Sequence, residues 1–117
     1  TFLVGAGSLG SALLQDKGLA AFGLNIEAAF DVDDAKVGTK VNDIEIYHID
    51  EFRAMAAERN VVIGIITVPA EHAQNVADLM VAWGIKAIWN FTPARIKVPS
   101  HIVAEYDDLH ESGDSFQ

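Results

Sequence analysis

Two features near the start of the chain have the residue types and spacing of a nucleotide-binding site. The first is a glycine loop, Gly5-Ala6-Gly7-Ser8-Leu9-Gly10, which follows a short apolar run. The second is Asp31, which ends the next apolar run about 20 residues further on. Glycine loops are common on their own. A strand, a glycine loop, a helix and then an acid at the end of the next strand are together typical of dinucleotide-binding folds.

Each residue of this pattern has a chemical reason to be there. We expect Gly5 to allow a tight turn, Gly7 to let the backbone approach a pyrophosphate, and Gly10 to let the helix pack against the strand. The N-terminus of that helix would offer N–H groups and the positive end of its dipole to phosphates. Asp31 would accept hydrogen bonds from a ribose. The expected phosphate-binding set also includes Ala6, Ser8 and Leu9.

The residues after Asp31 indicate which nucleotide is bound. Val32 is followed by Asp33 and Asp34, so a 2′-phosphate would meet three carboxylates and no neighbouring arginine. This acidic cluster favours NAD(H) over NADP. It would also bind the 3′-phosphate of coenzyme A, the alternative ligand, poorly. Lys36 is close enough in sequence to contact an adenine or a phosphate, although a solvated surface lysine explains it as well.

The hydrophobic pattern predicts an α/β fold that would position these residues. Strands are expected at 1–4, 26–30, 44–47, 61–68, 87–91 and 102–105, and helices at 8–22, 50–58 and from Pro69 to Trp83. Gly23 and Gly84 would end two of the helices, and Asp50 would be an N-cap. Alternating strands and helices predict a Rossmann-like, doubly wound parallel sheet with helices on both faces.

In such sheets, ligands bind beyond the carboxyl ends of the strands. The loops at 5–10, 31–34, 67–71 and 90–93 should therefore converge. Asn90, Phe91 and Pro93 would then lie near a nicotinamide ring, or else simply form the turn at the end of their strand. His72 is the one histidine close to this edge that could act as an acid or base. A partly exposed histidine at a helix start is the simpler interpretation.

Composition narrows the remaining possibilities. The chain has 117 residues, a net charge of −9 and no cysteine, which excludes thiol chemistry and disfavours nucleic-acid binding by this segment alone. We expect one domain over residues 1–109, followed by a polar tail over 110–117. No apolar run is long enough to cross a bilayer, so a cytoplasmic location without membrane contact is expected.

Taken in order, the motifs resemble the NAD(H)-binding domain of Rex, a family of bacterial redox-sensing transcriptional repressors. They also resemble the wider CoA-binding domain superfamily. The resemblance covers residues 1–109, and its carriers lie at 4–13, 28–33, 36–38, 47–51, 67–71, 73–74, 76–78, 84–86, 90–93 and 98–99.

The resemblance implies a homodimeric regulatory domain that reads the NADH/NAD⁺ ratio and is not an enzyme. DNA binding would belong to an N-terminal winged-helix domain, which this chain lacks. The glycine loop would hold the pyrophosphate, and Asp31 with Val32 would hold the adenosine. The nicotinamide side would be lined by Thr67, Val68, Pro69, Asn90, Phe91 and Pro93.

Two positions depart from the family pattern. Asp16 stands where the family usually has a tyrosine that helps the site respond to redox state, and the residues after Leu109 do not continue the family's apolar C-terminal helix. Three other functions therefore stay open: a CoA-binding domain, a fragment of a dehydrogenase, and a domain kept only for dimerisation.

Overall fold

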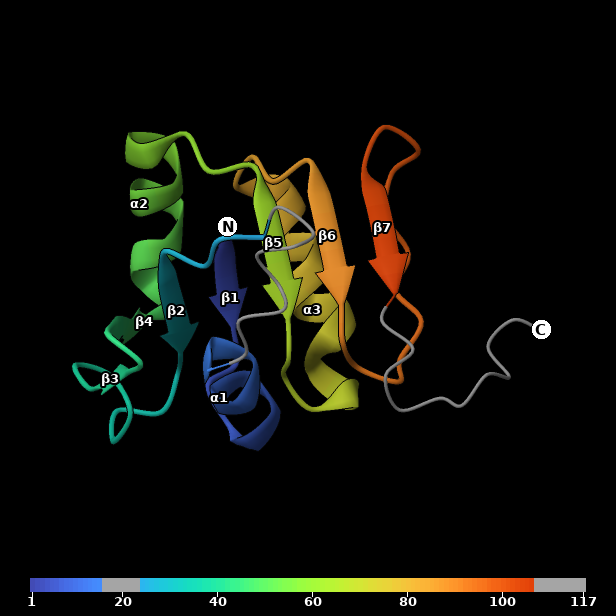
Figure 1. Ribbon diagram of the computed structural model, residues 1–117. Coiled ribbons are helices and arrows are strands. Elements are labelled where there is room, and N and C mark those ends of the chain that lie inside the picture. The colour runs from blue at the N-terminus through green and yellow to red at the C-terminus, as the bar shows by residue number, and fades with distance from the viewer. Residues whose placement is uncertain (16–23, 107–117) are drawn as a thin grey trace.

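The centre of the molecule is a seven-stranded sheet, seen in a computed structural model that describes residues 1–15 and 24–106 (Figure 1). The strands are β1 (Phe2–Val4), β2 (Ala28–Asp31), β3 (Lys40–Val41), β4 (Ile44–His48), β5 (Ile63–Ile66), β6 (Ala87–Asn90) and β7 (Val103–Tyr106). The helices are α1 (Ser8–Gln15), α2 (Phe52–Arg59) and α3 (Ala70–Ala82).

The strands lie in the order β3-β4-β2-β1-β5-β6-β7. All neighbouring pairs are parallel except β3 with β4, which are antiparallel. Without β3, the strands follow the order 3-2-1-4-5-6 of the Rossmann fold. The chain moves to one side of β1 to form β2 and returns to its other side to form β5. The switch point of the sheet is therefore the crevice between β1 and β5.

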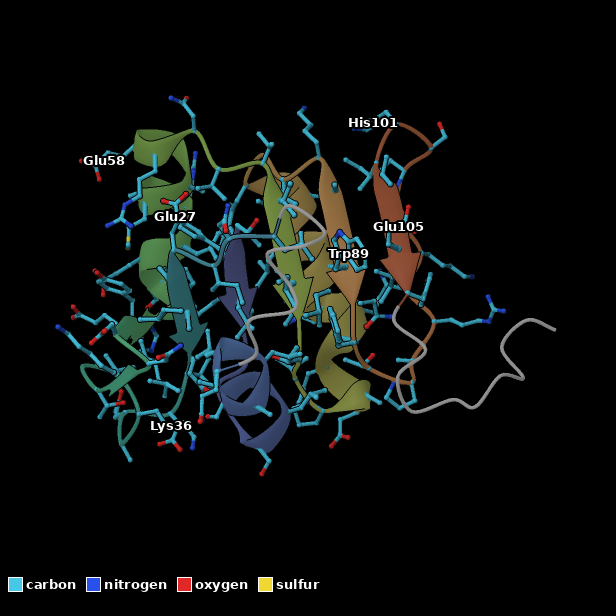
Figure 2. All side chains as sticks on the ribbon, viewed as in Figure 1. Glu27, Lys36, Glu58, Trp89, His101 and Glu105 are labelled. Atoms are coloured by element: carbon cyan, nitrogen blue, oxygen red, sulfur yellow. The ribbon has the colours of Figure 1, made fainter. Side chains whose placement is uncertain are left out.

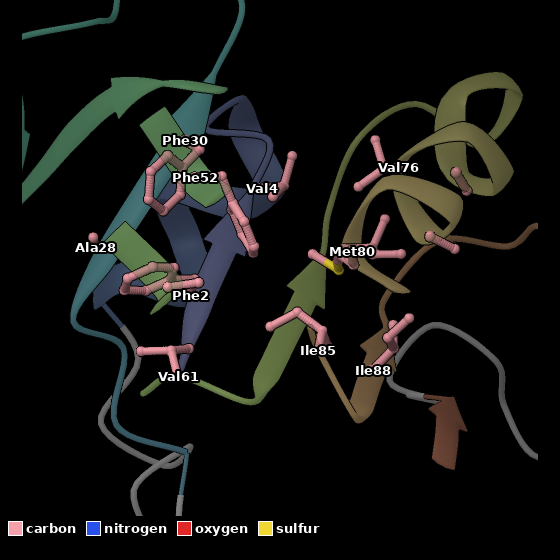
Figure 3. Close-up of a cluster of buried hydrophobic side chains, with 14 of the residues drawn as sticks. Phe2, Val4, Ala28, Phe30, Phe52, Val61, Val76, Met80, Ile85 and Ile88 are labelled. Atoms are coloured by element: carbon pink, nitrogen blue, oxygen red, sulfur yellow. The ribbon is translucent and has the colours of Figure 1, made fainter. Parts of the chain in front are cut away.

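Alternate residues of the central strands pack on opposite faces of the sheet. Phe2 and Val4 of β1 join the core formed with α2 and α3, whereas Leu3 joins the core formed with α1. Figure 3 shows the first of these cores, with Phe52 of α2 and Val76 of α3 packed beside the strands. The prediction of a Rossmann-like sheet with helices on both faces is confirmed.

Three phenylalanines stabilise the core beneath α2. The ring centroids of Phe2, Phe30 and Phe52 lie 4.9 to 5.3 Å apart, and all three side chains are fully buried. Such aromatic pairs contribute roughly 0.5–1.5 kcal/mol each beyond the burial of their area. This cluster fixes β1 and β2 side by side, and thereby fixes the two strands from which the expected site begins.

The start of α2 differs from the prediction. Asp50 is not its N-cap, because a 3-10 helix over Ile49–Glu51 comes first and α2 begins only at Phe52. The Nδ1 atom of His48 accepts a hydrogen bond from the Asp50 N–H at 3.1 Å, so histidine supplies the capping acceptor. Asp50, which the sequence suggested as the capping residue, instead donates its own backbone N–H to the capping side chain of His48.

A β-hairpin formed by β3 and β4 was not predicted. Asn42 and Asp43 connect the two strands, and both have positive φ angles, of 53° and 69°. Asn and Asp tolerate this left-handed conformation better than most residues, which is why they form tight hairpin turns. The hairpin continues the sheet beyond β4 and ends it with a strand of only two residues.

The limits of α3 agree closely with the prediction. Pro69 is its N-cap, Trp83 its C-cap, and Gly84 follows with a φ of 99°. Several predictions concern residues outside those that the structure describes. They are the continuation of the first helix to Phe22, its end at Gly23, the departure at Asp16, and the polar tail over 110–117. Among the helices that the structure describes, none is long and apolar enough to span a bilayer.

Candidate functional site

The glycine loop leaves β1 at the switch point and is held there by the neighbouring strands. The Gly5 N–H donates to the Phe30 carbonyl at 2.8 Å. The buried hydroxyl of Thr67, just after β5, lies 2.6 Å from the Gly5 carbonyl oxygen and 3.0 Å from that of Val4. These contacts fix the path of the loop before α1 begins at Ser8.

The three glycines of the loop have different steric roles. A Cβ on Gly5, which has a φ of +106°, would lie 2.8 Å from the Val68 nitrogen, and a Cβ on Gly10 would overlap the Gly5 carbonyl oxygen. Both positions therefore require glycine for the fold itself. A Cβ on Gly7 would meet nothing within 4 Å. The fold does not explain the glycine at position 7, whereas close approach of a ligand does.

Asp31 links the end of β2 to the glycine loop. Its Oδ2 atom accepts a hydrogen bond from the Ala6 N–H at 2.8 Å, and its Oδ1 atom accepts one from the Asp33 N–H at 3.0 Å. Each carboxylate oxygen thus has one backbone donor and keeps capacity for a second. The acid and the loop, which the sequence predicted as two parts of one site, are in direct contact.

A cavity of about 320 Å³ opens beside this contact. Its walls are mostly apolar, and its described lining contains one carboxylate, Asp31, and no lysine or arginine. The residues that line it come from β1, β2, α3, the loops that follow β1, β2 and β5, and the 3-10 helix after β4: Val4, Gly5, Gly7, Asp31, Val32, Ile49, Thr67, Val68, Pro69, His72, Asn75, Val76 and Leu79.

Many of the residues predicted from the sequence meet here. Gly5, Gly7, Asp31 and Val32 line the cavity together with Thr67, Val68 and Pro69. Ala6 contacts Asp31, while Ser8, Leu9 and Gly10 form the first turn of α1, which carries no acidic residue to oppose an anion. Lys36 lies in the turn after β2 and is not part of the cavity lining (Figure 2).

Three of the six residues expected on the nicotinamide side, Asn90, Phe91 and Pro93, are not in the lining of this cavity. Asn90 is fully buried, with Oδ1 accepting from the Thr92 N–H and hydroxyl at 2.9 and 2.8 Å and Nδ2 donating to the Ala94 carbonyl at 2.7 Å. Phe91 packs in the core on the α1 face, and Pro93 is exposed. The geometry of Asn90 matches the second interpretation given above, a turn at the end of its strand.

Sequence reasoning missed five of the lining residues: Val4, Ile49, Asn75, Val76 and Leu79. His72 and Asn75 are exposed and three positions apart, so they share one face of α3 at the cavity. The helical spacing of Val76 indicated only core. The signal that could have found Asn75 is its position one turn after His72, on a helix that starts at the carboxyl end of β5.

The described residues contain no cluster of three or more acidic or histidine side chains that could hold a metal ion. His101 lies in the turn just before β7, the outermost strand on that side of the sheet (Figure 2). His110 lies outside the described residues. The cavity offers apolar contact, together with hydrogen bonding by Asp31, by the side chains of His72 and Asn75, and by the loop amides.

Comparison with known proteins places this geometry in a family. The family model of the CoA-binding domain matches residues 1–94. The redox-sensing transcriptional repressor Rex of Bacteroides thetaiotaomicron is 58% identical over 109 residues, which cover 93% of this chain and 50% of the relative. The chain thus spans about half the length of the curated relatives it matches.

Solved structures show the same likeness. RSP, a Rex-family repressor crystallised with β-NADH, is 35% identical and superposes with a TM-score of 0.84 over 91% of this chain and 51% of its own. The same repressor crystallised with β-NAD⁺ and operator DNA has a TM-score of 0.85 over 92% of this chain and 50% of its own. The resemblance to Rex drawn from the sequence motifs is confirmed, and the chain belongs to the CoA-binding domain family.

Proposed function

We propose that this chain is an NAD(H)-binding regulatory domain of the Rex type. The observation that carries the proposal is the contact between Asp31 and Ala6, because it joins the acid and the glycine loop at the mouth of one cavity. The similar repressor RSP was crystallised with both NADH and NAD⁺. The same arrangement in this chain supports the same class of ligand.

The proposed binding mode follows from the geometry of the loop. The pyrophosphate lies over Gly7, where the backbone is open, and receives hydrogen bonds from the N–H groups of Ser8, Leu9 and Gly10 at the start of α1. The ribose hydroxyls donate to Asp31. The adenine lies in the cavity against Val32, and Lys36 stays a surface residue within reach of it. The nicotinamide extends toward Asn90, Phe91 and Pro93.

The role of the bound dinucleotide is regulatory rather than catalytic. The similar proteins reported above are transcriptional repressors, and the described lining of the cavity is mostly apolar, with Asp31 and His72 as its titratable side chains. We propose that NADH shifts a homodimer between two arrangements, and that DNA is bound by another part of the protein. A ligand can shift such an equilibrium only by its difference in affinity for the two states. The domain assignment, 1–109 with a polar tail over 110–117, belongs to this proposal.

Coenzyme A is the second candidate ligand, because the family model that matches the chain is that of a CoA-binding domain. The acidic residues after β2 oppose it. Asp33 and Asp34 are exposed beside Asp31, and the described cavity lining has no cation for a 3′-phosphate. NAD(H), with free ribose hydroxyls at this position, fits this environment better.

The test is isothermal titration of the chain with NADH, NAD⁺ and CoA in parallel. We expect both dinucleotides to bind and CoA to give no heat. Tighter binding of NADH than of NAD⁺ would support redox sensing, and equal affinities would contradict it. Tight CoA binding without a response to NADH would replace the proposal by the CoA alternative.

A further inference from the structure

We propose that adenine nucleotides without a nicotinamide ring, such as ADP-ribose and ADP, are ligands of this chain in their own right and compete with NAD(H). This inference rests on the proposed function, since it places the adenosine diphosphate half of the dinucleotide in the cavity described above. It adds a second class of ligand to the site, and with it a second input to whatever the domain regulates.

The cavity is asymmetric with respect to the glycine loop. Its lining comes from β1, β2, α3, the loop after β5 and the 3-10 helix after β4, and its described part includes no residue of β6 or of the segment that follows β6. It therefore lies to one side of the glycine loop. Its volume of about 320 Å³ is near the lower limit of small-molecule sites, which are roughly 300–1,000 Å³. A space of this size holds part of a dinucleotide.

The chemistry of the cavity suits an adenosine. Val4, Val68 and Leu79 offer apolar walls to a flat ring, while His72 and Asn75 place polar groups at the exposed rim. An adenine ring has apolar faces and a polar edge, and it matches this division. Beside the rim, Asp31 can accept from ribose hydroxyls, and the start of α1 can receive a diphosphate.

Asn90 and Phe91, on the other side of the loop, are already engaged in contacts within the fold. The side chain of Asn90 already uses both of its polar atoms within its own turn, and Phe91 is 3% exposed. Forming ligand contacts there would require breaking existing hydrogen bonds or exposing a core residue. The described residues at and after the end of β6 therefore offer nicotinamide no free contacts, whereas the cavity offers adenosine diphosphate a preformed place, so we expect the affinity to come mostly from the adenosine diphosphate half.

Competition titrations test this directly. The chain is titrated with NADH, then with NADH in the presence of ADP-ribose, ADP or reduced nicotinamide mononucleotide. We expect ADP-ribose to displace NADH with an inhibition constant within about 30-fold of the NADH dissociation constant, and the mononucleotide to need more than about 1,000-fold excess. Binding of NADH with no displacement by ADP-ribose, or strong displacement by the mononucleotide, would overturn the inference.

The outcome also separates this inference from the proposed function. Binding of ADP-ribose without binding of NADH would contradict the proposed function and leave the adenine-nucleotide site standing. Binding of NADH without any binding of ADP-ribose would support the proposed function and contradict this inference. If none of the nucleotides binds, both fail.

Matched variants locate the shared site. Leu79→Phe narrows the cavity, and we expect it to weaken NADH and ADP-ribose by the same factor, about 10-fold or more. Val62→Phe is the control, because Val62 is 47% exposed and lies just before β5, at the opposite end of the sheet. Unchanged ADP-ribose affinity in Leu79→Phe would contradict the placement of adenine.

A second variant tests the same site independently, so that the inference can still be tested if Leu79→Phe does not fold. The double substitution His72→Ala with Asn75→Ala removes two exposed side chains and leaves the core intact. We expect an equal loss for both ligands, of about fivefold, with an unchanged thermal midpoint. A loss for NADH alone would show that the two ligands do not share the cavity.

Discussion

The carboxylate of Asp31 and the backbone N–H of Ala6 form a 2.8 Å hydrogen bond across 25 positions of the chain. The residue that we expect to hold the ribose therefore also orients the loop that we expect to hold the pyrophosphate. Because Asp31 is anchored through Asp33 as well, its orientation is set before a ligand arrives. Such preorganisation lowers the entropic cost of binding.

Replacing Asp31 by alanine removes both the ribose acceptor and the anchor of the loop. We expect Asp31→Ala to weaken NADH binding by about 1–3 kcal/mol, the scale of a hydrogen bond to a charged group. Asp33→Asn is the control, since Asp33 reaches Asp31 through its backbone N–H and keeps that donor. Titration calorimetry of both variants measures the difference. Full NADH affinity in Asp31→Ala would remove the central argument for the site.

The glycine loop allows binding and folding to be separated by two substitutions. Gly7→Val meets open space, so we expect a change in the free energy of unfolding below about 1 kcal/mol but a loss of NADH affinity above about 10-fold. Gly10→Ala places a methyl group on the Gly5 carbonyl, and we expect it to destabilise the fold by about 2 kcal/mol or more. Urea denaturation and NADH titration distinguish the two effects. Unimpaired NADH binding by Gly7→Val would place the pyrophosphate elsewhere.

Thr67 tests how far the site depends on the strand beside it. Thr67→Val keeps the shape of the side chain but removes the hydroxyl that contacts the Gly5 and Val4 carbonyls. We expect a loss of about 1–3 kcal/mol in the free energy of unfolding, because a buried acceptor loses its donor. NADH affinity should fall with it. Thr67→Ser retains the hydroxyl and should restore both properties; a serine variant as impaired as the valine variant would attribute the effect to packing.

Gln74 tests whether the segment after β6 takes part in binding. Its side chain donates to the Lys97 carbonyl at 2.9 Å and accepts from the Lys97 N–H at 2.7 Å, which fastens this segment to α3. We expect Gln74→Ala to lower the free energy of unfolding by about 1 kcal/mol and to leave ADP-ribose affinity unchanged. Asp78→Asn, which alters only the remaining contact of Gln74, should have a smaller effect on stability. An ADP-ribose affinity that falls in Gln74→Ala would bring this segment into the site.

The sequence was sufficient to predict the centre of the fold, because strong local signals agree there. The run at 61–68 predicted a strand buried on both faces, and β5 lies between β1 and β6 as that burial requires. Gly84 predicted the end of α3, since a positive φ follows the last turn. In both cases the determining interaction is local or depends only on hydrophobic periodicity.

The errors arise where one side chain could serve two purposes. Asp50 is a good capping residue, but His48 caps first because the end of β4 places its ring over the Asp50 N–H. The apolar residue Val76 belongs both to the core and to the cavity wall. Hydrophobic spacing along a helix cannot show which of its buried residues face a gap, since the gap is set by the tilt of that helix against the sheet.

The position of β1 between β2 and β5 also determines the order in which the molecule can assemble. β1 precedes β5 in the sequence, and the contact between Thr67 and Gly5 that shapes the loop after β1 spans 62 positions. Contacts this distant in sequence require closure of a long loop and slow the folding of a domain. A nascent chain that has not yet extended past β5 therefore contains the complete glycine motif but not the loop conformation. We therefore expect the proposed nucleotide binding to begin only after most of this domain has been made.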